Sequence, residues 1–267
     1  MQYGYCMNVD FVRGDAMSLA TLNGVAEAGY DYVELPLSAL WGLAPWDMPA
    51  LKEALKKIPC RACNIFFPGG LTIVGPQADM KLVNAYLEKM VPMAAGLGAE
   101  VLVFGSGAAR KIPEGGSREA TWDNLRQVVE TMDIHAQRAG VKILMEPLNT
   151  GETDMINSYG EAVALTQGLA HVATMVDSYH VAMEGQSYDD VYKHPQAMLH
   201  LHTAYPIGRM VPSPTDDMGQ YADFVKMVKT LGYNGKISVE GKLKATASRD
   251  IATEVGACLD VLKGLFS

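Results

Sequence analysis

The chain has 267 residues, 49% of them apolar and only 19% charged, so it is neither disordered nor fibrous and can form a sizeable hydrophobic core. Acidic residues outnumber basic ones by 30 to 22, and the resulting net charge of −8 disfavours a nucleic-acid-binding protein. No apolar run is long enough to span a bilayer, and the N-terminal segment lacks the basic and apolar blocks of a signal peptide. These features predict a cytoplasmic protein that binds neither membrane nor nucleic acid.

Short runs rich in β-branched residues alternate along the chain with longer helical patterns. The predicted strands, in chain order, are 2–8, 30–35, 62–67, 100–104, 141–146, 172–177, 197–203 and 236–240. The predicted helices are 16–28, 48–57, 79–97, 117–139, 158–169, a short one near 188–193, 217–231 and 248–265. Glycines at 29, 98, 140 and 232 follow four of the helices, as expected for left-handed helix caps.

Eight strand–helix pairs of this kind predict a parallel sheet covered by helices. We expect a single domain, residues 1–267, folded as a (β/α)8 TIM barrel, with a doubly wound open sheet as the alternative. The longer connections all follow strands and would form one rim of the barrel, where active sites lie; they are 37–46, 68–77, 105–116, 147–157 and 205–216.

Four cysteines are too few for a disulfide scaffold, but Cys60 and Cys63 form a C-x-x-C pair. An offset of three residues on a strand is expected to point the two side chains to opposite faces. We therefore interpret the pair as two small buried side chains and not as a redox or zinc motif.

Side chains that can bind a metal end four consecutive strands. Glu146 ends the fifth strand and Asp177 the sixth, whereas His202 ends the seventh and Glu240 the eighth. In a closed barrel these side chains would point at one spot, and three carboxylates with one imidazole suit Mn²⁺, Mg²⁺ or Co²⁺, with Zn²⁺ also acceptable. The alternative is four solvated or hydrogen-bonded strand ends without a metal.

Other polar residues lie in the rim loops, where they could meet the hydroxyl groups of a substrate. They are Arg110, Glu152, His180 and Arg209. His200 shares a strand face with His202 and is expected one layer deeper in the barrel, where it would not be a ligand.

Several motifs resemble those of the xylose isomerase-like TIM barrels, the sugar phosphate isomerase/epimerase group that includes ketose 3-epimerases, hydroxypyruvate isomerases and inosose-processing enzymes. The most specific is EPLNTGETDMINS at 146–158; the others are D-x-x-H at 177–180, H-x-H at 200–202 and Y-x-G-x-x-x-x-E at 233–240. The resemblance covers nearly the whole chain. It implies that Glu146, Asp177, His202 and Glu240 bind one divalent metal ion, that Glu146 and Glu240 also form an acid/base pair, and that Glu152, His180 and Arg209 contact the substrate.

The function implied is a metal-dependent epimerase or isomerase of a sugar or sugar phosphate, acting by proton transfer next to a carbonyl through an ene-diolate. An inosose dehydratase or isomerase on the same scaffold is the alternative. The endonuclease IV enzymes of the same superfamily need a histidine-rich zinc cluster, and this chain has only six histidines. A sugar-binding barrel without catalysis is disfavoured by the intact glutamate pair. Related barrels often pair through their helices, so a homo-oligomer is compatible with the sequence.

Overall fold

The computed structural model describes residues 1–267 and contains a closed barrel of eight parallel strands in sequence order. The strands are β1 (Gln2–Cys6), β2 (Tyr32–Pro36), β3 (Cys60–Asn64), β4 (Val101–Phe104), β5 (Lys142–Met145), β6 (Val172–Asp177), β7 (Met198–Thr203) and β8 (Lys236–Val239). Strand β8 pairs with β1 and closes the barrel, which confirms the predicted fold and excludes the open sheet.

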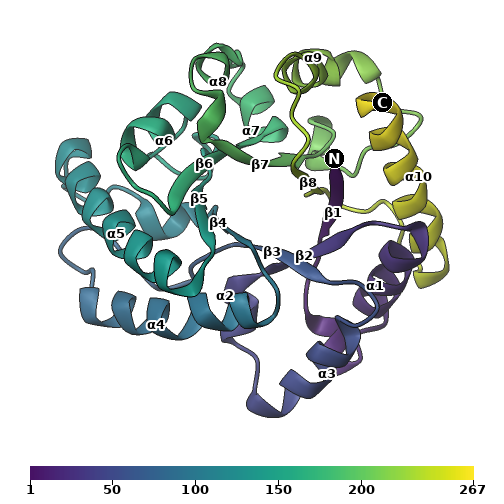
Figure 1. Ribbon diagram of the computed structural model, residues 1–267, viewed down its shortest axis with the longest axis horizontal. Helices are drawn as coiled ribbons and strands as arrows, with labels where there is room; N and C mark the ends of the chain where they lie inside the picture. Colours follow the sequence, from purple (N-terminus) through teal and green to yellow (C-terminus); the bar gives the residue numbers. More distant parts are fainter.

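Ten α-helices surround the strands, as Figure 1 shows in the view down the barrel. They are α1 (Ala16–Ala28), α2 (Leu37–Trp41), α3 (Met48–Ala54), α4 (Met80–Gly96), α5 (Arg118–Ala139), α6 (Tyr159–Thr166), α7 (Ser178–Met183), α8 (Asp189–Lys193), α9 (Ala222–Thr230) and α10 (Ser248–Phe266). Five of them begin at a side chain that accepts a backbone N–H, namely Asp15, Asp79, Ser117, Ser158 and Asp177. None of the helices is both long and apolar enough to cross a membrane.

The barrel interior is filled from its own strands, and one glycine is required for the fit. A Cβ on Gly4 of β1 would lie only 2.1 Å from the ring of Tyr32 on the neighbouring β2, so only glycine leaves room for that tyrosine. The Tyr32 hydroxyl is hydrogen-bonded to Ser238 Oγ on β8 at 2.9 Å. The interior is therefore partly polar, and it changes from apolar packing to hydrogen-bonded groups toward the rim.

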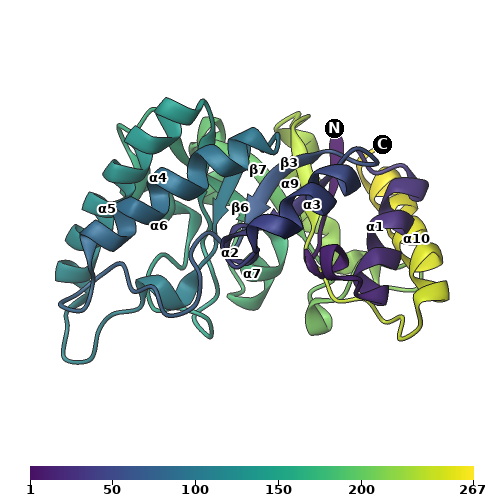
Figure 2. The ribbon, with the colours of Figure 1, turned by 90° about the horizontal axis from the view of Figure 1, so that it is seen from below.

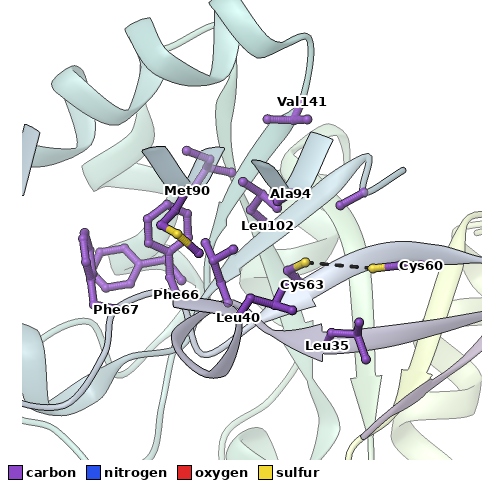
Figure 3. Packing of buried hydrophobic residues seen from close by; sticks show 14 of the residues in the cluster. Leu35, Leu40, Cys60, Cys63, Phe66, Phe67, Met90, Ala94, Leu102 and Val141 are labelled. Carbon is purple, nitrogen blue, oxygen red and sulfur yellow. Dashed lines mark hydrogen bonds between the residues drawn. The ribbon is translucent and has the colours of Figure 1, made fainter. Parts of the chain in front are cut away.

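The C-x-x-C pair lies in the apolar layer between the barrel and its helices, and our expectation for its geometry was wrong. The two sulfur atoms are 4.0 Å apart, and both side chains are buried among apolar neighbours (Figure 3). The reason is a β-bulge: Val33 of β2 pairs with Cys60 and Glu34 with Ala62, so Arg61 is an extra residue that shifts the alternation of faces. Cys60 and Cys63 therefore point to the same side of the sheet.

The long connections lie at one edge of the barrel. In the side view of Figure 2 they extend along the lower edge, whereas the two termini lie at the upper edge. Strand β1 starts near the N-terminus, so the lower edge carries the carboxyl ends of the parallel strands. This is the rim where the sequence placed its candidate site residues.

Candidate active site

The four predicted metal ligands converge at the carboxyl ends of β5 to β8. One donor atom from each of Glu146, Asp177, His202 and Glu240 can be chosen so that all four lie within 4.8 Å of one another. His202 is at the centre, because its Nδ1 lies 3.3 Å from Glu146 Oε1 and 3.1 Å from Glu240 Oε2. The spacing of the four residues along the sequence therefore translates into one compact cluster.

Local backbone contacts fix two of these carboxylates. Asp177 is the N-cap of α7, and its Oδ1 accepts the N–H of Tyr179 at 2.8 Å, which leaves Oδ2 facing the cluster. Glu146 occupies space that only a glycine opposite can provide, because a Cβ on Gly105 would lie 1.9 Å from Glu146 Oε2. The loop after β4 is thus shaped around the carboxylate that follows β5.

Arg209 supplies a positive charge to the cluster. Its guanidinium Nη2 lies 2.7 Å from Glu240 Oε2 and 3.3 Å from Asp177 Oδ2, and Nη1 lies 3.3 Å from Glu152 Oε1. The backbone of Arg209 has a φ of +54°, a strained value for a residue with a side chain. Hydrogen bonds hold it there, since Lys242 N donates to Arg209 O at 2.8 Å, directly beyond β8.

His180 is held in one tautomer by Asn149. Both the backbone N–H and the side-chain amide of Asn149 donate to His180 Nδ1, at 3.1 and 2.9 Å. The proton of the neutral ring is then on Nε2, which is buried and has no hydrogen-bond partner. The Asn149 amide also donates to Glu152 Oε1 at 3.0 Å, so the three predicted substrate contacts, Glu152, His180 and Arg209, lie together beside the cluster.

A cavity of about 380 Å³ opens onto this cluster. One group of lining residues, here called the charged wall, consists of Glu146, Glu152, His180, Arg209 and Glu240. A second group, here called the neutral wall, comes from the loops after β3 and β4 and consists of Ile65, Phe67, Pro68, Gly69, Gly70, Leu71, Thr72 and 105–109; Leu148, after β5, completes the lining. No lysine lines the cavity, and Arg209 is its only cationic side chain.

Arg110, expected at the rim to meet a substrate, lies elsewhere. It is fully buried behind the cavity, where Nη1 donates to Phe104 O at 3.0 Å and Nη2 to Glu146 O at 2.7 Å. Burial lowers the pKa of its guanidinium to about 10, so it stays charged at neutral pH. Arg110 therefore links the ends of β4 and β5 and cannot contact a ligand in the cavity.

The three carboxylates of the cluster differ in acidity. Burial raises the pKa of Glu146, and His202 only partly opposes it. Burial also raises the pKa of Asp177, to about 6, against the effect of Arg209. For Glu240 the effect of burial is outweighed by His202 and Arg209, which lower its pKa to about 2. Two neighbouring carboxyl groups with opposite shifts are a common arrangement for an acid and a base.

The two histidines of the site also differ. Burial opposes the charged form of His202, but Glu34 and Glu240 outweigh it and hold the pKa of this imidazole well above its usual value. Burial lowers the pKa of His180, which is thus neutral at pH 7. His202 is the centre of charge compensation in the cluster, and His180 is a neutral hydrogen-bond donor beside it.

Sequence reasoning missed two buried residues that touch the cluster. Asn64, at the end of β3, donates its amide N–H to Glu240 Oε1 at 2.9 Å. Glu34, in the middle of β2, accepts from His202 Nε2 at 3.0 Å. The sequence does contain a signal for Glu34. In Tyr32–Pro36 (YVELP) a glutamate interrupts an apolar strand, as Glu146 does in residues 144–147 (LMEP).

The donor set fits a divalent cation. Three carboxylates and one imidazole nitrogen, buried or partly buried, lie around one point, and Arg209 and the ring of His202 compensate part of their charge. Buried like charges at this spacing repel one another unless a cation is present. Hard oxygen ligands with one imidazole suit Mn²⁺, Mg²⁺ or Co²⁺. The cluster is thus a chemically reasonable metal site.

The barrel and this buried cluster together define the class: a (β/α)8 barrel whose strand ends form a candidate metal centre. A profile of the family described as "Xylose isomerase-like TIM barrel" matches residues 22–260, and the chain belongs to that family. No curated protein matches the sequence.

Solved structures of sugar epimerases have the same fold. The D-psicose 3-epimerase of Clostridium cellulolyticum H10, solved with D-tagatose, is 19% identical with a TM-score of 0.79, and the match covers 100% of both chains. The D-allulose 3-epimerase of Methylomonas sp., solved with D-allulose, is 21% identical with a TM-score of 0.81 over 99% of this chain and 96% of that chain. The 3-keto-D-glucoside 4-epimerase of E. coli is 18% identical with a TM-score of 0.76 over 99% of each chain. At these identities the similarity shows the fold alone.

Proposed function

We propose that this protein is a metal-dependent sugar epimerase or isomerase in which Glu146 and Glu240 are the acid/base pair. The observation that carries the proposal is that both carboxylates line one cavity and flank the same atom, His202 Nδ1, at 3.3 and 3.1 Å. A substrate carbon held above that atom would have a carboxyl group on either side. The structural similarity to ketose 3-epimerases supports this assignment.

The two glutamates would divide the proton transfers between them. Glu240 would remove the proton from the carbon next to a carbonyl. Glu146 would return a proton on the other side. Return to the opposite face of the same carbon gives an epimer, and return to the neighbouring carbon gives aldose–ketose isomerisation.

A divalent cation held by Glu146, Asp177, His202 and Glu240 would polarise the substrate carbonyl and stabilise the negative charge of the ene-diolate. His180 would donate its Nε2–H to a substrate hydroxyl, since this buried donor makes no hydrogen bond within the protein and lies 3.5 Å from Asp177 Oδ2. Arg209 and Glu152, at the mouth of the same wall, would bind further hydroxyl groups.

The charges around the cavity favour a sugar without a phosphate group. Glu146, Glu152 and Glu240 line the cavity, whereas Arg209 is the only cation there and already faces three carboxylates. Phosphate-binding sites usually combine several cationic groups or a helix N-terminus. We therefore propose a free ketose or aldose as the substrate, and expect its phosphorylated form to react at least ten-fold more slowly in kcat/KM.

The test is incubation of the Mn²⁺-loaded protein with free and phosphorylated ketoses, aldoses and inososes in D₂O, followed by NMR. Deuterium at one carbon of a free sugar, together with a new epimer or isomer, is the expected result. Chelation should abolish the exchange and Mn²⁺ should restore it. An inosose that loses water instead would assign the protein to the dehydratases, and exchange in the metal-free protein would contradict the metal-dependent mechanism.

Glu240→Gln is the matched variant for this experiment. The change keeps the size of the side chain and one oxygen ligand but removes the base, so we expect kcat to fall by about 10²–10⁴-fold. Glu130→Gln, on the exposed face of α5, is the control and should leave kcat unchanged. Turnover by Glu240→Gln close to that of the unchanged protein would reject the role of Glu240.

A further inference from the structure

Glu34 is a fully buried carboxylate for which the proposed reaction has no use. It lies inside the barrel on β2, with no exposed surface, and is not one of the four converging residues at the rim. A buried carboxylate is costly unless hydrogen bonds or opposite charges compensate it. Such a group is retained in a barrel interior only if the surrounding residues satisfy it, and its partners indicate what it does.

The partners of Glu34 are two histidines and a serine. Its Oε1 accepts from His202 Nε2 at 3.0 Å, and its Oε2 accepts from His200 Nε2 at 3.0 Å and from Ser238 Oγ at 2.6 Å. The two imidazole rings are 5.1 Å apart in an edge-to-face arrangement. Both oxygens of Glu34 are thus occupied, and each holds a ring of strand β7.

The contact with His202 decides which nitrogen of that ring is presented at the rim. Because Nε2 donates to Glu34, the opposite nitrogen, Nδ1, faces Glu146 Oε1 and Glu240 Oε2. Histidines that bind metals generally donate their second ring N–H to a carboxylate or carbonyl, which fixes the tautomer and the orientation of the ring. Glu34 occupies this position behind His202.

We propose that Glu34 is a positioning residue that presents Nδ1 of His202 to a divalent cation and thereby sets the affinity of the cluster for metal. The inference rests on the proposed function, since it assumes that the cluster holds a metal ion. Glu34 does not touch the substrate cavity, because it is absent from the cavity lining. Its effect is therefore expected mainly on metal binding.

A competing interpretation is that Glu34 is itself a metal ligand. Donor atoms of Cys6, Glu34 and His202 also lie within 4.8 Å of one another. A cation at this second position would have to displace the hydrogen bond between Glu34 and His202. The two interpretations differ in metal stoichiometry and in the effect of Cys6→Ser.

The test is titration of the metal-free protein with MnCl₂, with free Mn²⁺ followed by electron paramagnetic resonance. Glu34→Leu removes both acceptor oxygens, so we expect Mn²⁺ affinity to fall by about 10–100-fold. Glu34→Gln can still offer one oxygen to His202, so its loss is expected to be smaller than that of Glu34→Leu. Thr166→Val is the matched control, since it removes a buried hydrogen bond, to Ala162 O at 2.9 Å, without touching Glu34 or its partners.

Thermal unfolding of each metal-free variant separates loss of stability from loss of affinity. Unchanged Mn²⁺ affinity in Glu34→Gln and Glu34→Leu would overturn the positioning role while leaving the proposed function intact. Two Mn²⁺ ions per chain, one lost in Cys6→Ser, would show that Glu34 is a ligand. Failure of the unchanged protein to bind Mn²⁺ would reject both proposals.

A second measurement does not depend on how the variants fold. Nitrogen-15 NMR of the Mg²⁺-loaded protein should show His202 protonated at Nε2 and unprotonated at Nδ1. The opposite tautomer would overturn the proposal, because Nδ1 would then be unable to bind the metal.

Discussion

The two walls of the cavity are built in different ways. The charged wall comes from residues beyond the ends of β5, β6, β7 and β8 and is held by ion pairs and hydrogen bonds; the neutral wall comes from the loops after β3 and β4 and carries no charged side chain. A charged group needs a rigid, fully compensated setting to be placed accurately, whereas an apolar surface requires only shape. Under the proposed function, the charged wall would determine the reaction and the neutral wall would determine which sugar fits.

The two walls meet at Gly105, and breaking this contact should have the largest effect. In Gly105→Ala the new Cβ would clash with Glu146 Oε2, so the carboxylate must move. A displacement of about 1 Å in a catalytic group can cost about 100-fold in rate, and we expect a loss of this size in kcat with weaker Mn²⁺ binding. Gly69→Ala, in the same wall but with nothing within 4 Å of its new Cβ, is the control. Equal activity of the two variants would disprove the requirement for glycine.

Removing the only cation of the charged wall should have an intermediate effect. Arg209→Gln eliminates the contacts with Glu152, Asp177 and Glu240, and we expect KM to rise about 10–100-fold, as for the loss of charged hydrogen bonds. The metal-free variant should also unfold at a lower temperature, and Mn²⁺ should restore most of the loss. Arg249→Gln, at an exposed arginine of α10, is the control. A normal KM together with normal metal-free stability would contradict the role of Arg209.

Shortening a side chain of the neutral wall should have the smallest effect on activity. Ile65 lines the cavity but is 44% exposed, so Ile65→Ala loses only part of an apolar contact, about 1 kcal/mol or less, which is a factor of about five in KM. Steady-state kinetics on a series of sugars would measure it, with kcat unchanged. Ile134→Ala, at an exposed position of α5, is the control. A large fall in kcat for Ile65→Ala would mean that the neutral wall takes part in the reaction.

The fold could be predicted well because the periodic alternation of apolar and polar residues indicates directly which side chains are buried. The observed bounds of α1 and β6 are those expected, and the metal-competent residues at the ends of strands five to eight do converge. Chain periodicity cannot show a bulge, so the side to which Cys60 points was mispredicted. The contacts of Asn64 and Glu34 depend on partners more than a hundred residues away, which no local pattern contains.

Backbone strain also escaped prediction, and it too is concentrated at the cavity. Three non-glycine residues have positive φ, and two of them, Ile65 and Arg209, belong to the neutral and charged walls respectively. Strained residues of this kind persist only where surrounding contacts hold them, and they often lie at functional sites. Each wall therefore contains at least one residue whose positive φ is energetically unfavourable and whose side chain lines the cavity.

The buried arginine behind Glu146 has a consequence for how the site responds to acidity. The bonds of Arg110 go to main-chain oxygens of Phe104 and Glu146, and its charge persists far above the pH range in which carboxylates and imidazoles titrate. The hydrogen bonds of Arg110 therefore keep the ends of β4 and β5 linked behind the proposed acid/base pair while the side chains of the site gain or lose protons. Lysine could not replace it, since one ammonium group lacks the planar fork that spans two strand ends.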